Sequence, residues 1–412
     1  MRRILLALAA ATASMLPSPA AVPAYLLLGD GAPAFTAENL LTADRGVNWA
    51  LDRILAGRSD TLRTPGGILH RAIRMALVDV PIDYMPMLIQ HEAFGHGTRM
   101  REAGYGAYAI RVHPLWPYGD GHGATFGAQP PADATLDEAV ATHGGGMDAN
   151  DVFARSMRLR WVADGRLDRH QAHLYFLNAG NRPAYVWRTG RGRPYGNGDG
   201  DVNRMIASLN ARNGDRTISG RPLDAEDLRY RTLPALLDPY AWIALRAALD
   251  LHMVRGRPGG ALPMPSIGGV RLLPLARTGF APYGPEYYLE CLLALRSRTL
   301  SVTWRQSDPG MEEAYGLGLS GRNLASGRGW ALDARAETWR QPRLRLGGSW
   351  VEQLRQGTAA AENGAGLWLT FRWREARGLL LELGGKTRGY VQGEPLGATL
   401  MARGGLSFAW PG

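Results

Sequence analysis

The first half of the chain carries its apolar residues at helical spacings. Between about Phe35 and Val254, segments such as LLTADRGVNWALDRIL, MDANDVFARSMRLRWVADG and LLDPYAWIALRAALDLHM place apolar residues three or four positions apart, which is the period of one helix face. Connectors rich in Gly, Pro and Asn separate them, notably over 116–131 and 188–201, and this composition is typical of loops. The pattern predicts a mainly helical domain over residues 25–260.

The pattern changes to a period of two after Gly259. In TLSVTWRQ the apolar Leu300, Val302 and Trp304 alternate with polar neighbours, which is typical of a strand with one apolar face. Similar alternation appears in EYYLECLLALR, AYGLGLSGR, GWALDARAETWRQ, RLRLGGSW, GLWLTFRWRE, GLLLELGGKTRGY and LMARGGLSFAW. We therefore predict an α+β protein, in which about eight antiparallel strands form a second domain over residues 261–412.

Two architectures fit these strands: a soluble β-sandwich and an outer-membrane β-barrel. Aromatic residues stand at strand ends, at Trp304, Trp339, Trp373 and Trp410, where membrane barrels carry their girdles. The polar face is crowded with Arg and Glu, and the terminal LSFAWPG resembles the aromatic-terminated last strand of bacterial outer-membrane proteins. These features favour an antiparallel β-barrel of about eight strands over the sandwich.

The N-terminus reads as a secretory signal. Arg2 and Arg3 precede an apolar stretch over 4–16, and small residues near Ala20 and Ala24 offer cleavage sites. The alternative is a membrane anchor, but the apolar run is shorter than the ~20 residues that a span needs. We predict a signal peptide over residues 1–24 and a location in the outer membrane, with the periplasm as second choice.

The amino-acid composition indicates a folded chain and limits the partners that it could bind. With 412 residues and 45% hydrophobic content the chain can build a core. Its single cysteine, Cys291, excludes an intrachain disulfide. The formal charge of +10 would suggest nucleic acid in a cytosolic protein, but on a secreted chain it favours anionic surfaces such as lipopolysaccharide phosphates. We therefore expect outer-membrane lipid as a partner, and no nucleic acid.

The candidate chemistry lies at His91-Glu92-Ala93-Phe94-Gly95-His96. On a regular α-helix a spacing of five places two side chains about 140° apart, too far to grip one ion. One extra residue in the turn, a π-bulge, would bring position i+5 to where i+4 normally lies, and Gly95 makes this distortion easier. The preceding segment is apolar, so the pair is predicted on a buried helix. A buried histidine that only forms hydrogen bonds is the alternative for each.

The same six residues resemble the His-Glu-x-x-Gly-His motif of the dipeptidyl peptidase III family of zinc peptidases. The resemblance implies that His91 and His96 bind Zn²⁺ and that Glu92 is the general base. That family takes its acidic ligand from a Glu-Glu-x-x-Ala-Glu/Asp segment, which this chain lacks. The third ligand must therefore come from elsewhere.

The segment ATHGGGMDAND offers two candidates for that ligand. Asp148 is our first choice because it would project from the first turn of a helix, and His143 is the second. The alternative is that Asp148 caps the helix and needs no metal.

The remaining histidines and a Gly/Asp-rich loop are weaker candidates. His170 and His173 are spaced as a helical surface pair, and His113 and His122 lie in a loop that would border a cleft. The segment NGDGDVN lacks the downstream glutamate of an EF-hand calcium loop.

The expected function follows from the motif and the barrel. We expect a secreted zinc hydrolase, in first place a metallopeptidase, that acts on a peptide or a lipid-linked substrate at the outer membrane. The alternatives are a metal-dependent lipid or lipopolysaccharide hydrolase, and a non-enzymatic barrel with a helical plug.

Overall fold

The computed structural model describes residues 22–55, 63–126, 130–190, 200–214, 220–295, 298–348, 360–373 and 377–410. The expected signal peptide lies outside these ranges except for its last three residues, which belong to strand β1 (Val22–Leu28). The chain combines helices with a large antiparallel sheet, so the mixed α+β prediction is confirmed.

The helices lie between Pro33 and Val254. They are α2 (Pro33–Leu55), α3 (Pro65–Arg74), α4 (Val80–Ile89), α5 (Gly97–Glu102), α6 (Leu136–Asp164), α7 (Arg169–Arg188), α8 (Asp201–Arg212), α9 (Ala225–Thr232), α10 (Pro239–Arg246), the π-helical η3 (Met75–Asp79), η4 (Gln90–His96) and η7 (Ala247–Val254), and the 3-10 helix η6 (Leu233–Leu237). Helix α6 is central and buried along most of its length; a capping box of Thr135 and Glu138 starts it, and Gly165 in the left-handed conformation ends it.

The main sheet has ten strands in the order β1-β14-β13-β12-β11-β10-β9-β8-β7-β6. After β1 its strands are β6 (Ser266–Ile267), β7 (Val270–Ala281), β8 (Gly284–Leu295), β9 (Arg298–Ser307), β10 (Tyr315–Gly327), β11 (Trp330–Pro342), β12 (Ala361–Trp373), β13 (Arg377–Lys386) and β14 (Thr399–Trp410). Two small ribbons pair β2 (Ala109–Val112) with β3 (Gly123–Phe126), and β4 (Arg166–Asp168) with β5 (Gly259–Ala261).

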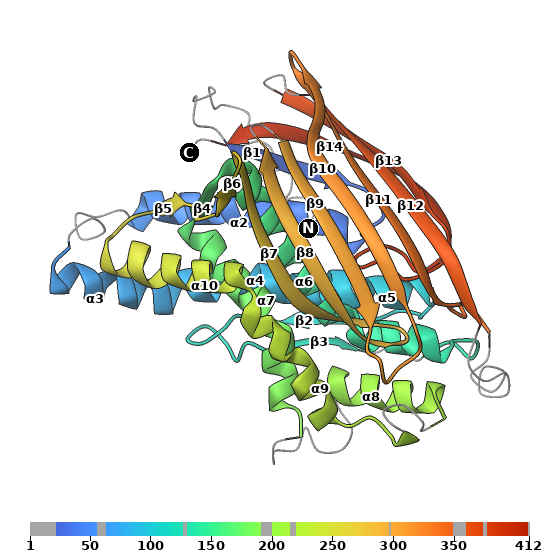
Figure 1. Cartoon of the computed structure of the whole chain (residues 1–412). Helices are drawn as coiled ribbons and strands as arrows, with labels where there is room; N and C mark the ends of the chain where they lie inside the picture. The colour runs from blue at the N-terminus through green and yellow to red at the C-terminus, as the bar shows by residue number, and fades with distance from the viewer. Residues whose placement is uncertain are drawn as a thin grey trace.

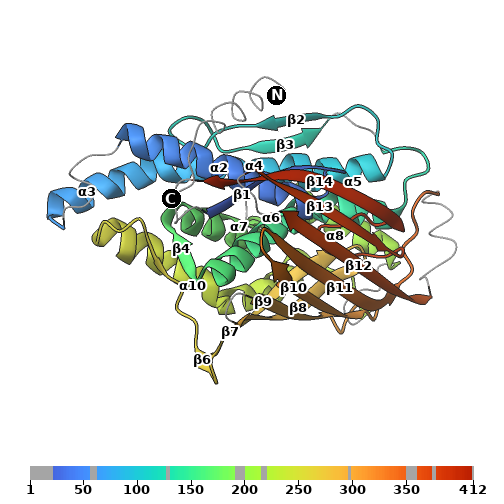
Figure 2. The ribbon, with the colours of Figure 1, turned by 90° about the horizontal axis from the view of Figure 1, so that it is seen from above.

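The sheet is not a closed barrel, so that part of the prediction is not supported. β1 and β6 form its two ends, and within the described ranges no pairing joins them. Helices occupy the space that closure would need: β1 packs on α2, while β7 packs on α6, α9, α10 and η6. Figures 1 and 2 show the helices gathered on the concave side of the curved sheet.

The strand predictions differ from the structure in several places. β1, β6 and β7 of the main sheet and the strands of the two ribbons were not expected, and segment 343–348 of RLRLGGSW is not a strand. Its backbone N–H groups at Arg345 and Gly347 donate instead to the carboxylates of Asp137 (2.7 Å) and Glu138 (2.9 Å), at the start of α6. These acids satisfy the segment's donors, so it needs no neighbouring strand.

In much of the sheet the alternation is the reverse of that in a soluble domain, although Leu273, Leu275 and Leu292 of β7 and β8 pack inward against the helices. In β9 the polar Ser301 and Arg305 are buried against the helices, whereas Val302 and Trp304 are exposed. The concave side is polar because ion pairs fill it: Glu290, 1% exposed, meets guanidinium groups of α6. Trp339, predicted for an aromatic girdle, is buried on this concave side at 4% exposure. The Trp410 side chain lies outside the described part.

Candidate metal centre

The π-helix predicted at the motif is present. Residues Gln90–His96 form η4, continuous with α4 before it and α5 after it. The wider turn brings the imidazoles of His91 and His96 together, with ring centroids 4.9 Å apart. Five residues of spacing therefore place both side chains on one side of the helix.

Hydrogen bonds from α6 fix the orientation of both imidazoles. The His91 Nδ1 lies 3.1 Å from the Asn150 Oδ1, and the His96 Nδ1 lies 2.7 Å from the Thr142 carbonyl oxygen. The Thr142 carbonyl oxygen accepts from the His96 Nδ1, and in both rings the Nε2 is the nitrogen that faces Asp201. Metal-binding histidines are commonly held in this way.

The third position beside the histidines is taken by Asp201. Its Oδ2 lies 3.2 Å from the His96 Nε2 and 3.6 Å from the His91 Nε2. Asp201 is the first residue of α8, directly after Gly200, and its Oδ2 also accepts a hydrogen bond of 3.1 Å from the Tyr185 hydroxyl. His91, His96 and Asp201 therefore offer three donor atoms within 4.8 Å of one another.

Asp148, the third ligand predicted from the sequence, is directed elsewhere. Its Oδ1 accepts from the Tyr390 hydroxyl at 2.8 Å, its Oδ2 accepts from the backbone N–H of Gly393 at 3.4 Å, and Arg99 forms an ion pair with it at 3.6 Å. It lies in the middle of α6, which begins at Leu136, so it caps nothing. The structure does not bring Asp148 to the histidines; it ties α6 to the loop before β14.

Glycines let α6 and η4 touch. A Cβ on Gly146 would overlap the His91 imidazole, and a Cβ on Gly95 would lie 2.6 Å from the Gly145 carbonyl oxygen. No larger residue fits at either contact without displacing its neighbour. Gly145 and Gly146 of α6 therefore allow Asn150 and Thr142 to reach the two rings.

Glu92 is held on the other side by the β2–β3 ribbon. It is 5% exposed, and its Oε2 accepts a hydrogen bond of 2.8 Å from the Thr125 hydroxyl. A Cβ on Gly123 would come within 2.6 Å of its Oε1, so this glycine makes room for the carboxylate. The ribbon therefore fixes the Glu92 carboxylate, which is near enough to His96 to raise the pKa of that imidazole.

Charge concentrates at this centre. Burial by itself would lower the pKa of His96, but the Asp201 carboxylate and, more weakly, Glu92 raise it to about 9. Burial likewise disfavours ionised Asp201, yet His96 and His91 hold its pKa well below the ordinary range. His143, the second-choice ligand, borders the group: burial lowers its pKa to about 4, with Asp201 and His96 acting on it.

The donor set suits zinc. Two neutral imidazoles and one carboxylate are the protein ligands of many catalytic zinc sites, which keep a fourth position open. Asp201 is 26% exposed in its side chain whereas both histidines are nearly covered, so the open side of the site is that of Asp201. No fixed spacing links it to the motif, and its only local sign is an acid at a helix start after a Gly-rich loop.

The four remaining histidine candidates form two further groups. His113 and His122 lie between β2 and β3, where both pair with Asp120, at 2.9 and 3.3 Å, on the surface. His170 and His173 are not a surface pair: each is 5% exposed. They belong to a buried polar cluster that lies apart from the motif.

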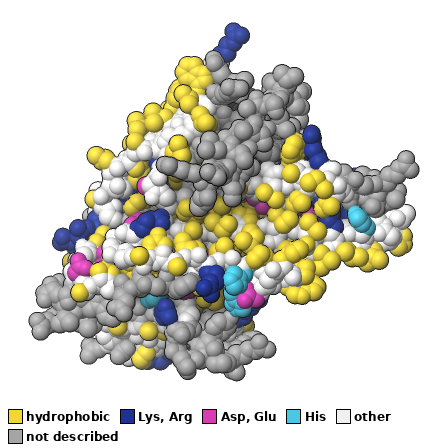
Figure 3. Space-filling model, turned by 180° about the vertical axis from the view of Figure 1, so that it is seen from behind, with side chains coloured by type: hydrophobic (Ala, Val, Ile, Leu, Met, Phe, Trp, Pro, Cys, Tyr) yellow, Lys and Arg dark blue, Asp and Glu magenta, His cyan; other side chains and the backbone are white. Residues whose placement is uncertain are grey.

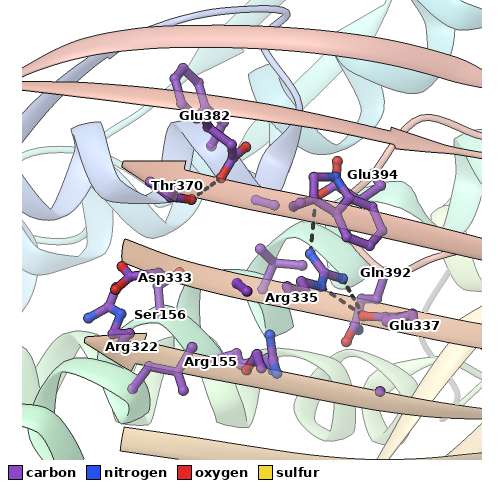
Figure 4. A pocket seen from close by; sticks show the side chains of 18 of the residues that line it. Arg155, Ser156, Arg322, Asp333, Arg335, Glu337, Thr370, Glu382, Gln392 and Glu394 are labelled. Carbon is purple, nitrogen blue, oxygen red and sulfur yellow. Dashed lines mark hydrogen bonds and ion pairs between the residues drawn. The ribbon is translucent and has the colours of Figure 1, made fainter. Parts of the chain in front are cut away.

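A cavity of about 220 Å³ separates α2 and α6 from the concave side of the sheet. Arg335 crosses it between Glu337 and Glu394, at 2.6 and 3.0 Å (Figure 4). Its α6 lining is Val152, Arg155, Ser156 and Leu159, whereas the α6 residues at the histidines lie earlier in the helix. His91, His96 and Asp201 do not line the cavity, so it is separate from the candidate metal centre.

The face of the molecule opposite to the one seen in Figure 1 is largely apolar in its middle. Figure 3 shows hydrophobic side chains over much of its middle, with charged groups scattered between them. In the described part of the chain no helix is both long and apolar enough to cross a bilayer.

Comparison of the chain with protein-family models, with curated proteins and with solved structures gave no match.

Proposed function

We propose that this protein is a zinc-dependent hydrolase, in first place a metallopeptidase, whose metal ligands are His91, His96 and Asp201. The observation that carries the proposal is the convergence of two Nε2 atoms and one carboxylate oxygen within 4.8 Å, next to a fixed glutamate. A purely structural histidine pair would need neither the π-helix nor the convergence of both Nε2 atoms on one carboxylate.

The chemistry divides between the ion and the chain. Zinc, when bound, supplies the Lewis acidity that makes water acidic near pH 7 and polarises a carbonyl group. Glu92 accepts the proton of the attacking water and passes it to the leaving nitrogen or oxygen. Thr125 keeps the Glu92 carboxylate in place, and Asn150 and Thr142 keep the two rings in the required orientation. The bond cleaved is an amide or an ester.

Metal content and turnover, measured on the same samples, test this assignment. We expect His91→Ala and His96→Ala to lose the zinc of this site, and Glu92→Gln to keep it while turnover of a mixed peptide substrate falls by about 10²–10⁴. Equal metal loss in all three variants would show that Glu92 is a ligand. Unchanged zinc affinity in His91→Ala would refute the site.

We also propose that the convex side of the sheet lies against lipid, as at the bacterial outer membrane. Its outward positions are leucines and aromatics that alternate with the polar, inward ones. Members at least 37% exposed are Leu289, Val302, Trp304, Tyr315, Leu317, Leu319, Leu367, Leu369, Phe371, Trp373, Leu379, Leu381, Leu383, Leu400 and Leu406. Exposing so continuous an apolar surface to water is energetically unfavourable, whereas contact with hydrocarbon is not.

Helices continue this surface past one end of the sheet. Leu236, Leu237 and Trp242, on η6 and α10, are 60%, 70% and 59% exposed, and both helices pack on β7. An uncovered sheet edge is not tolerated in hydrocarbon. The helices therefore cover β7 with apolar side chains, which suits an open sheet at a lipid surface.

Flotation with vesicles of phosphatidylethanolamine and phosphatidylglycerol tests lipid association. Leu383→Arg, in the middle of β13, should lower the bound fraction because an arginine facing hydrocarbon costs about 2–4 kcal/mol. The control is Ile110→Arg, an exposed residue of β2 on another side of the molecule (Figure 2). Equal flotation of both variants and the wild type would contradict the proposal.

The lipid-facing sheet also favours a second candidate, hydrolysis of lipid or lipopolysaccharide esters at the same metal centre. Turnover of a phospholipid or an acylated lipid substrate, with none of peptides, would select it. If the purified protein bound no metal, the remaining hypothesis would be a non-enzymatic outer-membrane protein.

A further inference from the structure

A second cluster of metal-ligating side chains lies in the helical core. Asp83 of α4 and His170 and His173 of α7 offer donor atoms that all lie within 4.8 Å of one another, and all three residues are buried. The Asp83 Oδ2 is 3.2 Å from the His173 Nδ1, and its Oδ1 accepts from Asn48 at 2.9 Å. Such sites in helical bundles are built from side chains on facing helices.

Polar atoms around this cluster have no hydrogen-bond partner. Asp44 of α2 is 4% exposed; its carboxylate faces that of Asp83, and no N–H or other side-chain donor bonds to it. The His170 Nδ1 and the His173 Nε2 are buried without any hydrogen-bond partner. Unsatisfied groups of this kind cost about 1–3 kcal/mol each, and more when charged. Their concentration at one place needs an explanation that the described side chains do not supply.

Side chains next to the cluster fix the orientation of its histidines, as is common in metal sites. The His170 Nε2 lies 3.3 Å from the Asp52 Oδ2 and 3.1 Å from the Arg169 Nε, so these two side chains fix the ring while its Nδ1 has no partner. A carboxylate behind a histidine is a recurrent feature of metal sites. Arg74 and Arg169 in turn hold Asp52.

The irregular helices provide independent support. Within the described residues the π-helical segments are η3, η4 and η7. η4 carries the motif, η3 ends at Asp79 beside the second cluster, and η7 carries the buried His252, whose ring centroid lies 6.4 Å from that of His173. π-helical turns are rare and concentrate at functional sites.

We infer that Asp44, Asp83, His170 and His173 form a second metal site, which binds a divalent transition-metal ion such as Zn²⁺ and joins helices α2, α4 and α7. Two imidazoles and two carboxylates suit zinc, iron or manganese better than calcium. Asp83 precedes His91 by eight residues, or about 12 Å along a helix. This ion is therefore not the partner of the first in a binuclear centre, whose ions lie about 4 Å apart.

The site does not depend on the proposed hydrolase, and its test separates the two. In a His91→Ala/His96→Ala double variant we expect one equivalent of zinc to remain by elemental analysis after dialysis. Added ZnCl₂ should raise the melting temperature of the metal-stripped double variant, because an ion that binds the folded state stabilises it. Adding His170→Ala and His173→Ala should abolish both effects.

A milder variant guards against failure to fold. Asp44→Asn keeps the size of the side chain; in the double-variant background it should weaken zinc binding at least tenfold and reduce the melting shift. Asp148→Asn, another buried acid, is the matched control and should leave both unchanged. Absence of metal from the double variant, with no melting shift on adding ZnCl₂, would overturn the inference. So would an Asp44→Asn protein that is more stable and binds zinc as before, because the acid would then be only an unpaired charge.

Discussion

One prediction tests the contact between α6 and the motif helix directly: Gly146→Ala should damage the metal centre, whereas Gly144→Ala should not. Both glycines are buried on the same helix, two residues apart. At Gly144 a Cβ would find the Met205 Sδ at 3.5 Å and the Phe280 Cβ at 3.7 Å, which is ordinary contact. At Gly146 it would overlap the imidazole of His91.

The expected effect of an added Cβ on stability differs between the two glycine positions. Replacing glycine by alanine inside a helix gains about 1 kcal/mol from helix propensity. Gly144→Ala keeps this gain. At Gly146 the overlap costs about 1–3 kcal/mol in displaced packing, and the displaced ring loses its hydrogen bond to Asn150 as well as its alignment with Asp201. We expect little net change in the stability of the metal-free protein, but a zinc affinity at least 10–100-fold weaker.

Competition with a chromophoric zinc chelator measures the affinity, and a denaturant titration of the chelated protein measures the stability. If the second metal site is also filled, the titration is done in a His170→Ala/His173→Ala background. Wild-type affinity in Gly146→Ala would refute the reasoning, as would an equal loss in Gly144→Ala.

Three further outcomes are expected. Asp201→Asn should weaken zinc binding by far more than tenfold, whereas Asp148→Asn should leave zinc binding unchanged and lower the unfolding free energy. If a chelator assay showed the larger loss of zinc affinity in Asp148→Asn, Asp148 would be the ligand, as the sequence predicted. Burial, with Arg99 nearby, lowers the pKa of Lys386 to about 8, so the folded state binds its proton less tightly than the unfolded state does. The unfolding free energy should therefore gain about 1–3 kcal/mol between pH 8 and 10.5, with no gain below pH 8, and Lys386→Met should lose this rise in melts at matched pH. Glu290→Leu should lower the unfolding free energy by about 3–5 kcal/mol, because the buried Arg158, 2% exposed, would keep its charge without a carboxylate partner. An unchanged unfolding free energy in chemical denaturation would contradict this.

Local sequence determined the parts of this protein that depend on near neighbours. The spacing of His91 and His96, with a glycine between them, was enough to predict the π-helix, because its geometry is set within one or two turns. Alternation with a period of two was enough to predict most strands of the sheet, because successive side chains of a strand must point to opposite sides. It also separated an apolar side from one filled with Arg and Glu.

Tertiary structure decided what depends on distant segments. The acid beside the two histidines is Asp201, which follows His96 by more than a hundred residues, and no local rule connects a helix start to a motif so far away. Asp148 had the right chemistry and a nearby position, but the face of α6 on which it lies turns it to Tyr390. The sheet stays open because helices pack on its two ends, and edge pairing is a property of the whole assembly that strand periodicity does not contain. His170 and His173 looked like a surface pair because helical spacing shows which side chains share a face, whereas only the packing of α7 against α2 and α4 shows what that face meets.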